Sequence, residues 1–304
     1  MAAIREIGKD ELEAWVATRR AVPDSDTGTV EDYLDWRRQA PGLQWLLAEE
    51  HGEGVAVGMV LPGWHAPPDV SELDVQVLRE HRGRGVGSAL LDELARRSEA
   101  LRRPVLRAQV RELDGDSLAW AERRGFSGIG RESRLVLELA GIEAPEVDPP
   151  HGIEIVTWAE RPELARAMYD VNLEASPDIP GSEDDEVPTY EEWLSADMQG
   201  ASDSPDAVFV ALEGDEVVGY AKFVISNARP GVLIHDLTGV KRAHRGRGIA
   251  GALKRTQIAW AKAKGFQKIE TMNEVRNEPI RRLNERHGYQ PTPGHIVLER
   301  RLGG

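Results

Sequence analysis

The sequence of 304 residues contains no cysteine, which excludes disulfides, thiolate nucleophiles and cysteine-ligated metals. No apolar stretch approaches the roughly 20 residues that a membrane helix requires. The start, MAAIREIGKDELEAW, lacks the apolar segment of a signal peptide, and the eight histidines lack the spacing of metal ligands. These absences predict a cytoplasmic protein with no metal and no membrane partner.

Basic residues are in the minority, with 38 Lys and Arg against 52 Asp and Glu and a formal net charge of −14. This balance argues against nucleic acid or an anionic membrane as a general partner. It permits a cationic substrate without requiring one. The length favours two domains of ordinary size, each able to bury its own core.

A basic, glycine-rich phrase occurs twice, as EHRGRGVGSAL at 80–90 and AHRGRGIAGAL at 243–253, which is an offset of 163 residues. At the same offset, RRGF at 123–126 falls on RHGY at 286–289. We therefore interpret the chain as a tandem duplication. The predicted domains cover residues 1–140 and 153–304, and a linker rich in Pro, Gly and acidic residues covers 141–152.

Both halves show the same order of expected elements. Two helices separated by a polar loop precede a hairpin, and a strand (SELDVQV or LIHDLTGV) then leads into the RGRG phrase. An amphipathic helix, a strand, a short helix ending at GF or GY and a last strand follow. The pattern predicts the α/β class, with a strand, a glycine loop and a helix at the centre of each half.

A strand that passes through a glycine loop into a helix aims several backbone N–H groups at one point. The helix N-terminus adds partial positive charge, and glycine lets the backbone approach a phosphate closely. The loops contain neither GxxxxGK[ST] nor GxGxxG. A solvated surface turn and an RGG-like RNA-binding tract are the alternatives. Two copies in the same strand–helix context favour a phosphate site.

The phrases VQVLREHRGRGVGSALL and TGVKRAHRGRGIAGALK resemble the acetyl-CoA motif of the GNAT superfamily of N-acetyltransferases, [QR]xxGx[GA] after a strand ending in Val. The second copy continues as IETMNEVRNEPIRRLNERHGY, which is similar to the family's TxNxxxNxPMxxxNxxxGF stretch. The resemblance implies two GNAT-like domains, each a mixed, mostly antiparallel sheet flanked by helices, with a splayed central strand.

The resemblance also implies acetyl-CoA as acyl donor and assigns residues to it. The exposed edge of the splayed strand would pair with the pantetheine arm through Val75 and Val77, and through Thr238 and Val240. The residues of the motif that would hold the pyrophosphate are Arg82, Gly83, Arg84, Gly85, Gly87 and Ser88 in the first copy, and Arg245, Gly246, Arg247, Gly248, Ala250 and Gly251 in the second.

The second half matches the family's cofactor signature more fully. Asn277 and Asn284 fall on family asparagines that contact the cofactor, whereas the first half has Asp114 and Ala121 there. We therefore predict that the second half is the catalyst. The tyrosine that serves many relatives as general acid is absent, because its two positions hold Ala121 and Asn284.

Transfer to an amine requires a base, because an amine with a pKa of ~10.4 is almost fully protonated at neutral pH. Glu72 and His235 each lie ten residues before the loop arginine, and Asp236 follows His235. We predict these three residues as catalytic. A solvated residue at a strand end is the alternative interpretation of Glu72.

The predicted function is transfer of acetyl to a primary amine of a small cationic molecule, such as an antibiotic, a polyamine or an amino sugar. From Asp178 to Glu192 the chain has seven acids and no bases, which suits either a lid over the acceptor or a solvated loop. Trp158, Tyr190 and Trp193 could wall the acceptor pocket or belong to the core.

Other functions stay open at this stage. Acetylation of a sugar-linked cysteinyl amine, as by mycothiol synthase, is the enzymatic alternative. A non-catalytic acyl-CoA-binding sensor or scaffold is the alternative from another class. A monomer and a homodimer are both compatible with the sequence.

Overall fold

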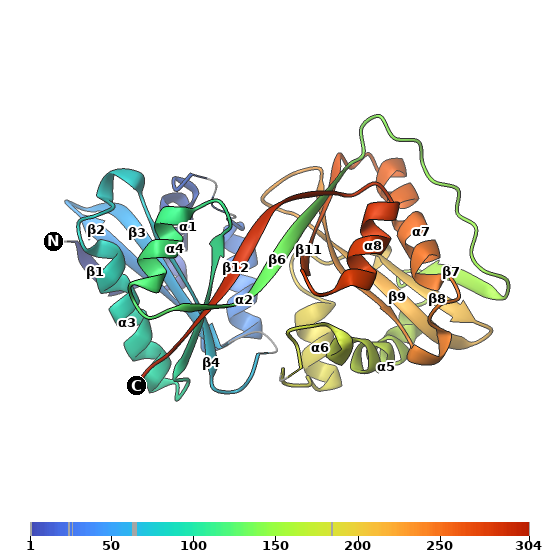
Figure 1. Ribbon diagram of the computed structural model, residues 1–304, viewed down its shortest axis with the longest axis horizontal. Helices are drawn as coiled ribbons and strands as arrows, with labels where there is room; N and C mark the ends of the chain where they lie inside the picture. Colours follow the sequence, from blue (N-terminus) through green and yellow to red (C-terminus); the bar gives the residue numbers. More distant parts are fainter. Residues whose placement is uncertain (1, 24, 26, 63–65, 184, 304) are drawn as a thin grey trace. The chain divides into compact units, whose positions relative to one another are not determined.

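The computed structural model describes residues 2–23, 25, 27–62, 66–183 and 185–303. The chain forms two compact units (Figure 1), one made of Met1–Ile129 with Ile296–Gly304 and the other of Gly130–His295. Each unit has a mixed α/β structure. Within the described ranges, no helix is long and apolar enough to cross a membrane.

The first unit has a sheet with helices on both faces. Residues of β2 alternate between two cores: Trp45 and Leu47 pack with α1 and α2, and Leu46 and Ala48 pack with α3. Its strands follow the order β1 (Ala3–Glu6), β2 (Gln44–Glu50), β3 (Glu53–Pro62), β4 (Val70–Val77), β5 (Val105–Arg111) and then β12 (Gln290–Arg301). Its helices are α1 (Leu12–Arg20), α2 (Val30–Gln39), α3 (Val86–Ala100) and α4 (Gly115–Glu122).

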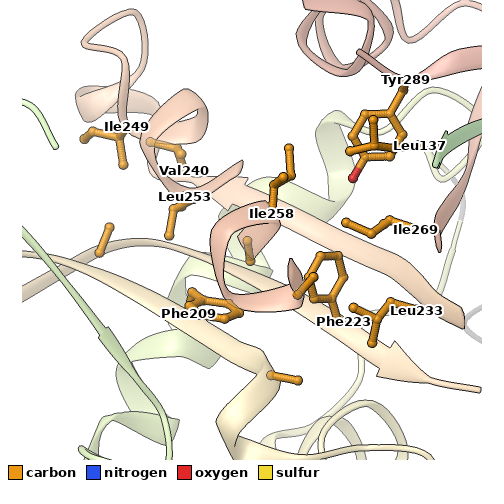
Figure 2. Close-up of a cluster of buried hydrophobic side chains, with 14 of the residues drawn as sticks. Leu137, Phe209, Phe223, Leu233, Val240, Ile249, Leu253, Ile258, Ile269 and Tyr289 are labelled. Carbon is orange, nitrogen blue, oxygen red and sulfur yellow. The ribbon is translucent and has the colours of Figure 1, made fainter. Parts of the chain in front are cut away.

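The second unit repeats this plan. Figure 2 shows one of its cores, where Leu253 and Ile258 of α7 pack with Phe209 and Phe223 of the sheet. Helices α5 and α6 cover a separate core. The strand order is β7 (Ile153–Thr157), β8 (Val208–Glu213), β9 (Glu216–Ile225), β10 (Val232–Val240), β11 (Lys268–Glu274) and β6 (Ser127–Glu138). The helices are α5 (Ala165–Ala175), α6 (Tyr190–Asp197), α7 (Ile249–Ala263) and α8 (Glu278–Arg286).

The central strand of each unit is splayed from its parallel neighbour. Strand β10 pairs with β11 only from Val232 to Ile234, although it continues to Val240. Strand β4 likewise pairs with β5 only from Val70 to Glu72. The pairs of β4 with β3 and of β10 with β9 are antiparallel. The predicted fold, a mixed sheet with a splayed central strand in each half, is confirmed.

The division into units differs from the predicted domains at the last strand of each half. Strand β6 belongs to the first repeat, yet it pairs with β11, and its Leu135 and Leu137 lie in the core of the second unit. The end of β12 contributes Leu298 and Leu302 to the core of the first unit. The two halves therefore exchange last strands, and the boundaries 1–140 and 153–304 follow the repeat rather than the compact units.

The predicted linker at 141–152 has no regular secondary structure and lies against α7. Arg255 Nη2 donates to the carbonyl of Asp148 at 2.8 Å, and Lys262 donates to the carbonyl of Ile142. Ile142 also packs on the core of the second unit. The connection is thus fastened to the helix that follows the glycine loop.

Candidate functional site

The unpaired ends of the two central strands expose backbone N–H groups along one edge. Leu78 N–H donates to Val55 of β3, and Lys241 N–H donates to Val218 of β9. Because N–H groups alternate in direction along a strand, those of Val77 and Val240 point away from that neighbour. The same alternation turns the N–H groups of Val75 and Thr238 toward the splayed edge. Both strands therefore direct N–H groups toward the edge at which the resemblance implies pairing with a pantetheine arm.

The two glycine loops have the same backbone geometry. Gly83 and Gly246 have φ of 74° and 77°, and Gly85 and Gly248 have φ of 86° and 85°. The second glycine of each pair is the N-cap of α3 or α7, and its residue type offers no side chain to cap the helix. The first N–H groups of these 15-residue helices are therefore available to an anion.

The first arginine of each loop binds the strand rather than projecting freely. Arg82 Nε donates to the carbonyl of Val77 at 3.1 Å, and Arg245 Nε donates to that of Val240 at 2.9 Å. The arginine of the motif thus fixes the turn between the strand and the loop. The hydrogen bond to the strand carbonyl forms only in the folded protein, so the charge pattern of the sequence does not predict it.

The loop histidines form a second repeated contact that the sequence analysis missed. His81 Nδ1 lies 3.2 Å from Glu50 Oε2, and His244 Nε2 lies 3.3 Å from Glu213 Oε2. Arg247 adds a bidentate pair with Glu213, at 2.9 and 2.7 Å. The histidine and glutamate both recur at the offset of 163, which is the signal that could have found them.

The residues at the start of α3 and α7 are closely packed. A Cβ atom at Gly87 would lie 3.3 Å from Val77 Cγ2 and 3.5 Å from the Trp120 ring. Ser88 Oγ accepts a hydrogen bond from Arg124, whose guanidinium stacks over Trp120 at 4.2 Å.

At the corresponding positions of the second unit, Ala250 packs against the core, and Gly251 has room for a Cβ at 3.5 Å from Arg255 Nη1. The Cβ at Gly251 would also lie 4.0 Å from Cε1 of His287, which follows α8.

The two predicted asparagines have different environments. Asn277 is half-buried at the N-cap of α8, and its side chain makes no capping hydrogen bond. Asn284 is only 1% exposed, and its Nδ2 donates to Asn273 Oδ1 at 2.8 Å. Asn273 lies on β11 beyond the pairing with β10, so Asn284 orients a side chain at the splay. Asn273 was not singled out from the sequence.

His235 is buried, with 4% of its surface exposed, and both ring nitrogens are engaged. Nε2 lies 3.1 Å from the Leu237 carbonyl and 2.7 Å from Thr238 Oγ1, and Lys254 Nζ contacts Nδ1. Burial, together with the adjacent Lys254, lowers the pKa of His235 well below its ordinary value. His235 therefore offers no free nitrogen to an acceptor amine.

Asp236 lies apart from His235 although the two are adjacent in sequence. The register of β10 against β9 jumps from His235↔Phe223 to Leu237↔Lys222, so Asp236 is the extra residue of a β-bulge. Its side chain is 49% exposed, and its Oδ2 lies 3.4 Å from Lys222 Nζ. Of the predicted catalytic residues in the second unit, Asp236 is the one that solvent reaches.

A buried lysine supports this carboxylate. Lys222 Nζ lies 2.9 Å from Asp203 Oδ1 as well as contacting Asp236. Burial disfavours the charged amine, yet Asp236 and Asp203 raise the pKa of Lys222 above its ordinary value. The ammonium charge is thus retained beside the bulge. Burial raises the pKa of Asp203.

The bulge also corrects the match between Glu72 and His235. Glu72 pairs in register with Arg107, whereas the residue that pairs with the corresponding Glu270 is Ile234. Counting ten residues back from the loop arginine makes His235 the counterpart of Glu72. That count is wrong by one residue, because the bulge adds Asp236 to β10 and the true counterpart of Glu72 is Ile234. Through the registers with β3 and β9, the counterpart of His235 is the buried Leu73.

The aromatic residues considered as pocket walls belong largely to the core. Trp158 and Trp193 are buried in the core that α5 and α6 cover, and Tyr190 of α6 packs against the same cluster. In the acidic stretch, Glu192 caps α6 with Thr189, and Glu183 accepts from Gly181 N–H at 2.8 Å. These groups have local structural roles.

Asp178 links the acidic stretch to the glycine loop. It accepts from Arg242 Nη2 at 2.7 Å and from Arg245 Nη1 at 2.6 Å. These hydrogen bonds, with Arg242 and then Arg245, lower the pKa of Asp178 to about 2. Because the folded-state pKa lies below the unfolded one, the stabilisation is present at neutral pH and is lost as the pH falls toward about 2.

Asp178→Asn is expected to strengthen acetyl-CoA binding a few-fold at low salt, because it removes a negative charge from beside the loop arginines. Its effect on unfolding free energy should stay within ~1 kcal/mol, as for exposed ion pairs. Calorimetric titration at two ionic strengths measures this, with Glu191→Gln as the matched loss of one charge on α6. Equal affinities of Asp178→Asn and the wild type at low salt would contradict the expectation.

Both halves match the acetyltransferase (GNAT) family, at residues 5–126 and 165–289, and the chain belongs to this family. A GCN5-related N-acetyltransferase from Sphaerobacter thermophilus has a similar structure, with 20% identity, a TM-score of 0.77, and coverage of 99% of this chain and 95% of that one. A tandem GNAT protein from the clavulanic acid biosynthesis pathway has 19% identity and a TM-score of 0.79, over 100% and 99% of the two chains. No curated protein matches the chain.

Membership of the family identifies a class of acyl donor. GNAT proteins bind acetyl-CoA as acyl donor. The uncapped N-termini of α3 and α7 fit a pyrophosphate, and the free strand edges fit the amide groups of a pantetheine arm. The chain is thus an acyltransferase with two GNAT-like halves.

Proposed function

We propose that the chain transfers an acetyl group from acetyl-CoA to a primary amine of a small cationic molecule, and that the second unit performs the reaction. One observation carries this proposal. In the second unit an exposed carboxylate, Asp236, occupies a bulge just beyond the last backbone pair of β10 with β11, Ile234↔Glu270, and before the free edge and the glycine loop. Strand β4 of the first unit pairs with β3 in unbroken register and has no such bulge.

Asp236 would serve as the general base. It takes a proton from the acceptor ammonium, and the free amine attacks the thioester carbonyl carbon. The carbon–nitrogen bond forms, the carbon–sulfur bond breaks, and coenzyme A leaves as its thiolate, which takes up the second proton that the nitrogen loses as it becomes an amide. A thiol with a pKa of ~8.5 leaves without a strong acid, which suits a site that lacks the tyrosine. N–H groups of the splayed edge would stabilise the developing oxyanion.

The side chains that flank the splay favour the second unit over the first. On β5 and α4, the first unit presents apolar residues, which pack with Val75 and Val77. The matching positions of the second unit are mostly polar. The residues compared at the offset of 163 are Ala108, Val110, Leu118 and Trp120 in the first unit and Thr271, Asn273, Arg281 and Leu283 in the second.

A cationic acceptor suits the charge of the chain. The net charge is −14, and the segment between α5 and α6 carries acidic residues without a base. A negative field raises the local concentration of a cationic substrate. Because a protonated amine is also the form that a carboxylate base acts on, charge and mechanism favour the same class of acceptor.

The test is release of coenzyme A from acetyl-CoA in the presence of a panel of amines: a polyamine, an aminoglycoside, an amino sugar and a neutral amine. The chain has no cysteine, so a thiol-reactive dye reports only the released coenzyme A. We expect release above the amine-free rate with cationic primary amines, and a product that carries one acetyl group by mass. The N-acetylated form of each amine is the control. No release with any amine would contradict the proposal.

A further inference from the structure

Helix α7 buries an amine at a place where the first unit has a leucine. Lys254 is 1% exposed, and its counterpart at the offset of 163 is Leu91, also 1% exposed. Burial lowers the pKa of Lys254 well below its ordinary value. A buried polar group lowers stability unless it is hydrogen-bonded, so an apolar residue would be the favourable choice if packing alone mattered.

The amine begins a hydrogen-bond chain that ends at the splayed edge. The Leu237 carbonyl can only accept, and it lies 3.1 Å from His235 Nε2, so Nε2 carries the ring hydrogen. Nδ1 is then the acceptor, and the Lys254 amine donates to it. On the other side, Nε2–H also reaches Thr238 Oγ1 at 2.7 Å. The hydrogen-bond chain therefore runs from Lys254 through His235 to Thr238.

This hydrogen-bond chain spans the bulge, and the first unit has no equivalent at the matching positions. Leu73, Leu91 and Val75 occupy the positions of His235, Lys254 and Thr238 there, and none of these side chains can form a hydrogen bond. The Lys254 amine also lies 5.1 Å from the centre of the Tyr289 ring, where the first unit has Phe126. The polar substitutions coincide with the unit that has the bulge and the exposed Asp236.

We infer that Lys254 is a positioning residue for the acyl donor: acting through His235, it holds the bulge of β10 and the Thr238 segment whose N–H groups face the donor. The inference rests on the proposed function of the second unit. Beyond Ile234, β10 has no backbone pairing with β11; it pairs with β9, and Thr271 Oγ1 of β11 donates to the His235 carbonyl at 3.0 Å. The hydrogen bonds from Lys254 of α7 supply a further anchor at the point where the strand changes register.

The test measures acetyl-CoA affinity and stability on the full chain. Lys254→Met keeps an unbranched chain of similar length and removes the donor. We expect the Kd for acetyl-CoA to rise about tenfold, because misplacing binding groups by a fraction of an ångström is costly. The Tm should stay close to the wild-type value, because the removal of a buried amine offsets the loss of the donor to the buried His235 Nδ1. A purely structural role for Lys254 predicts the opposite pattern, a lower Tm with the Kd unchanged.

Gln257→Leu is the matched control. Gln257 lies one turn further along α7, is fully buried, and has no hydrogen-bond partner for its side-chain N and O among the described residues. Its counterpart in the first unit is Leu94. This variant removes a buried polar group from the same helix face without touching the chain to Thr238. We expect a Tm at or above the wild-type value and an unchanged Kd.

Thr238→Val tests the other end of the chain at a partly exposed position. The variant keeps the backbone N–H and removes the hydroxyl, so the Kd for acetyl-CoA should rise while the protein still folds. If Lys254→Met does not fold, the Kd of Thr238→Val alone tests the inference. An unchanged Kd in both Lys254→Met and Thr238→Val, or an equal rise in Gln257→Leu, overturns the inference. Absence of acetyl-CoA binding by the wild type overturns the proposed function itself.

Discussion

Gly248→Asp is expected to weaken acetyl-CoA binding to the second unit by at least about 100-fold. Gly248 is the N-cap of α7, in the left-handed region at φ +85°, and the nearest atom to an added Cβ is Pro150 Cγ at 3.6 Å. A carboxylate there would lie beside the N–H groups that face the pyrophosphate. At an effective dielectric of ~20, two unit charges 4 Å apart repel by about 4 kcal/mol.

Three matched variants separate charge from backbone strain. Gly248→Asn has the same shape as the aspartate, tolerates a positive φ equally well and carries no charge, so it should lose far less affinity. Gly265→Asp puts the same residue at a glycine with φ +81° just beyond the other end of α7 and should bind normally. Gly85→Asp reports on the first unit. If asparagine weakens binding as much as aspartate, repulsion of the pyrophosphate is not the cause.

Asp236→Asn is expected to lower kcat by about 10²- to 10⁴-fold, which is the usual contribution of a general base. The side chain keeps its size and its place in the bulge, so the Kd for acetyl-CoA should change by no more than about twofold. Stopped-flow or steady-state release of coenzyme A with the best amine of the panel measures kcat. Calorimetry measures the Kd.

Glu72→Gln is the control for this prediction. Glu72 is the predicted carboxylate of the first unit, it is half-buried, and it pairs in register with Arg107. Its substitution should leave kcat close to the wild-type value. A large loss of kcat in Glu72→Gln with none in Asp236→Asn would place the reaction in the first unit.

The repeated phrase was sufficient to predict the glycine loops and the helices that follow them, and the resemblance to the GNAT family implied the splayed strands. The loops and helix starts depend on local rules, because glycine at positive φ and an uncapped helix N-terminus are encoded within a few residues, and strand alternation then fixes which N–H groups face the splayed edge. The N–H groups of Val75, Val77, Thr238 and Val240 lie at the edge for that reason.

The exchange of last strands could not be predicted in this way. Strands β6 and β12 both place apolar residues on one face, with Leu135 and Leu137 in one and Leu298 in the other. Either strand can complete either core by pattern alone. Which neighbour each one pairs with depends on the long-range competition between two similar cores, and a local pattern contains no information about it.

The different environments of the predicted catalytic residues of β10 could not be predicted from the sequence, and the bulge explains the difference. One extra residue in β10 shifts His235 into the core and leaves Asp236 at the surface, although the two are adjacent in sequence. Lys254 was missed because its contact with His235 joins two elements 19 residues apart. A residue-by-residue comparison of the two halves, with Lys254 against Leu91, was the available signal.

The central claim is that the second unit carries out acetyl transfer, and one comparison tests it most directly. Labelled acetyl-CoA is incubated with a cationic primary amine and the wild type, Gly85→Asp or Gly248→Asp, and the label in the amine is counted. We predict that the wild type and Gly85→Asp transfer the label and that Gly248→Asp does not. Transfer by Gly248→Asp at the wild-type rate, with none by Gly85→Asp, would contradict the claim.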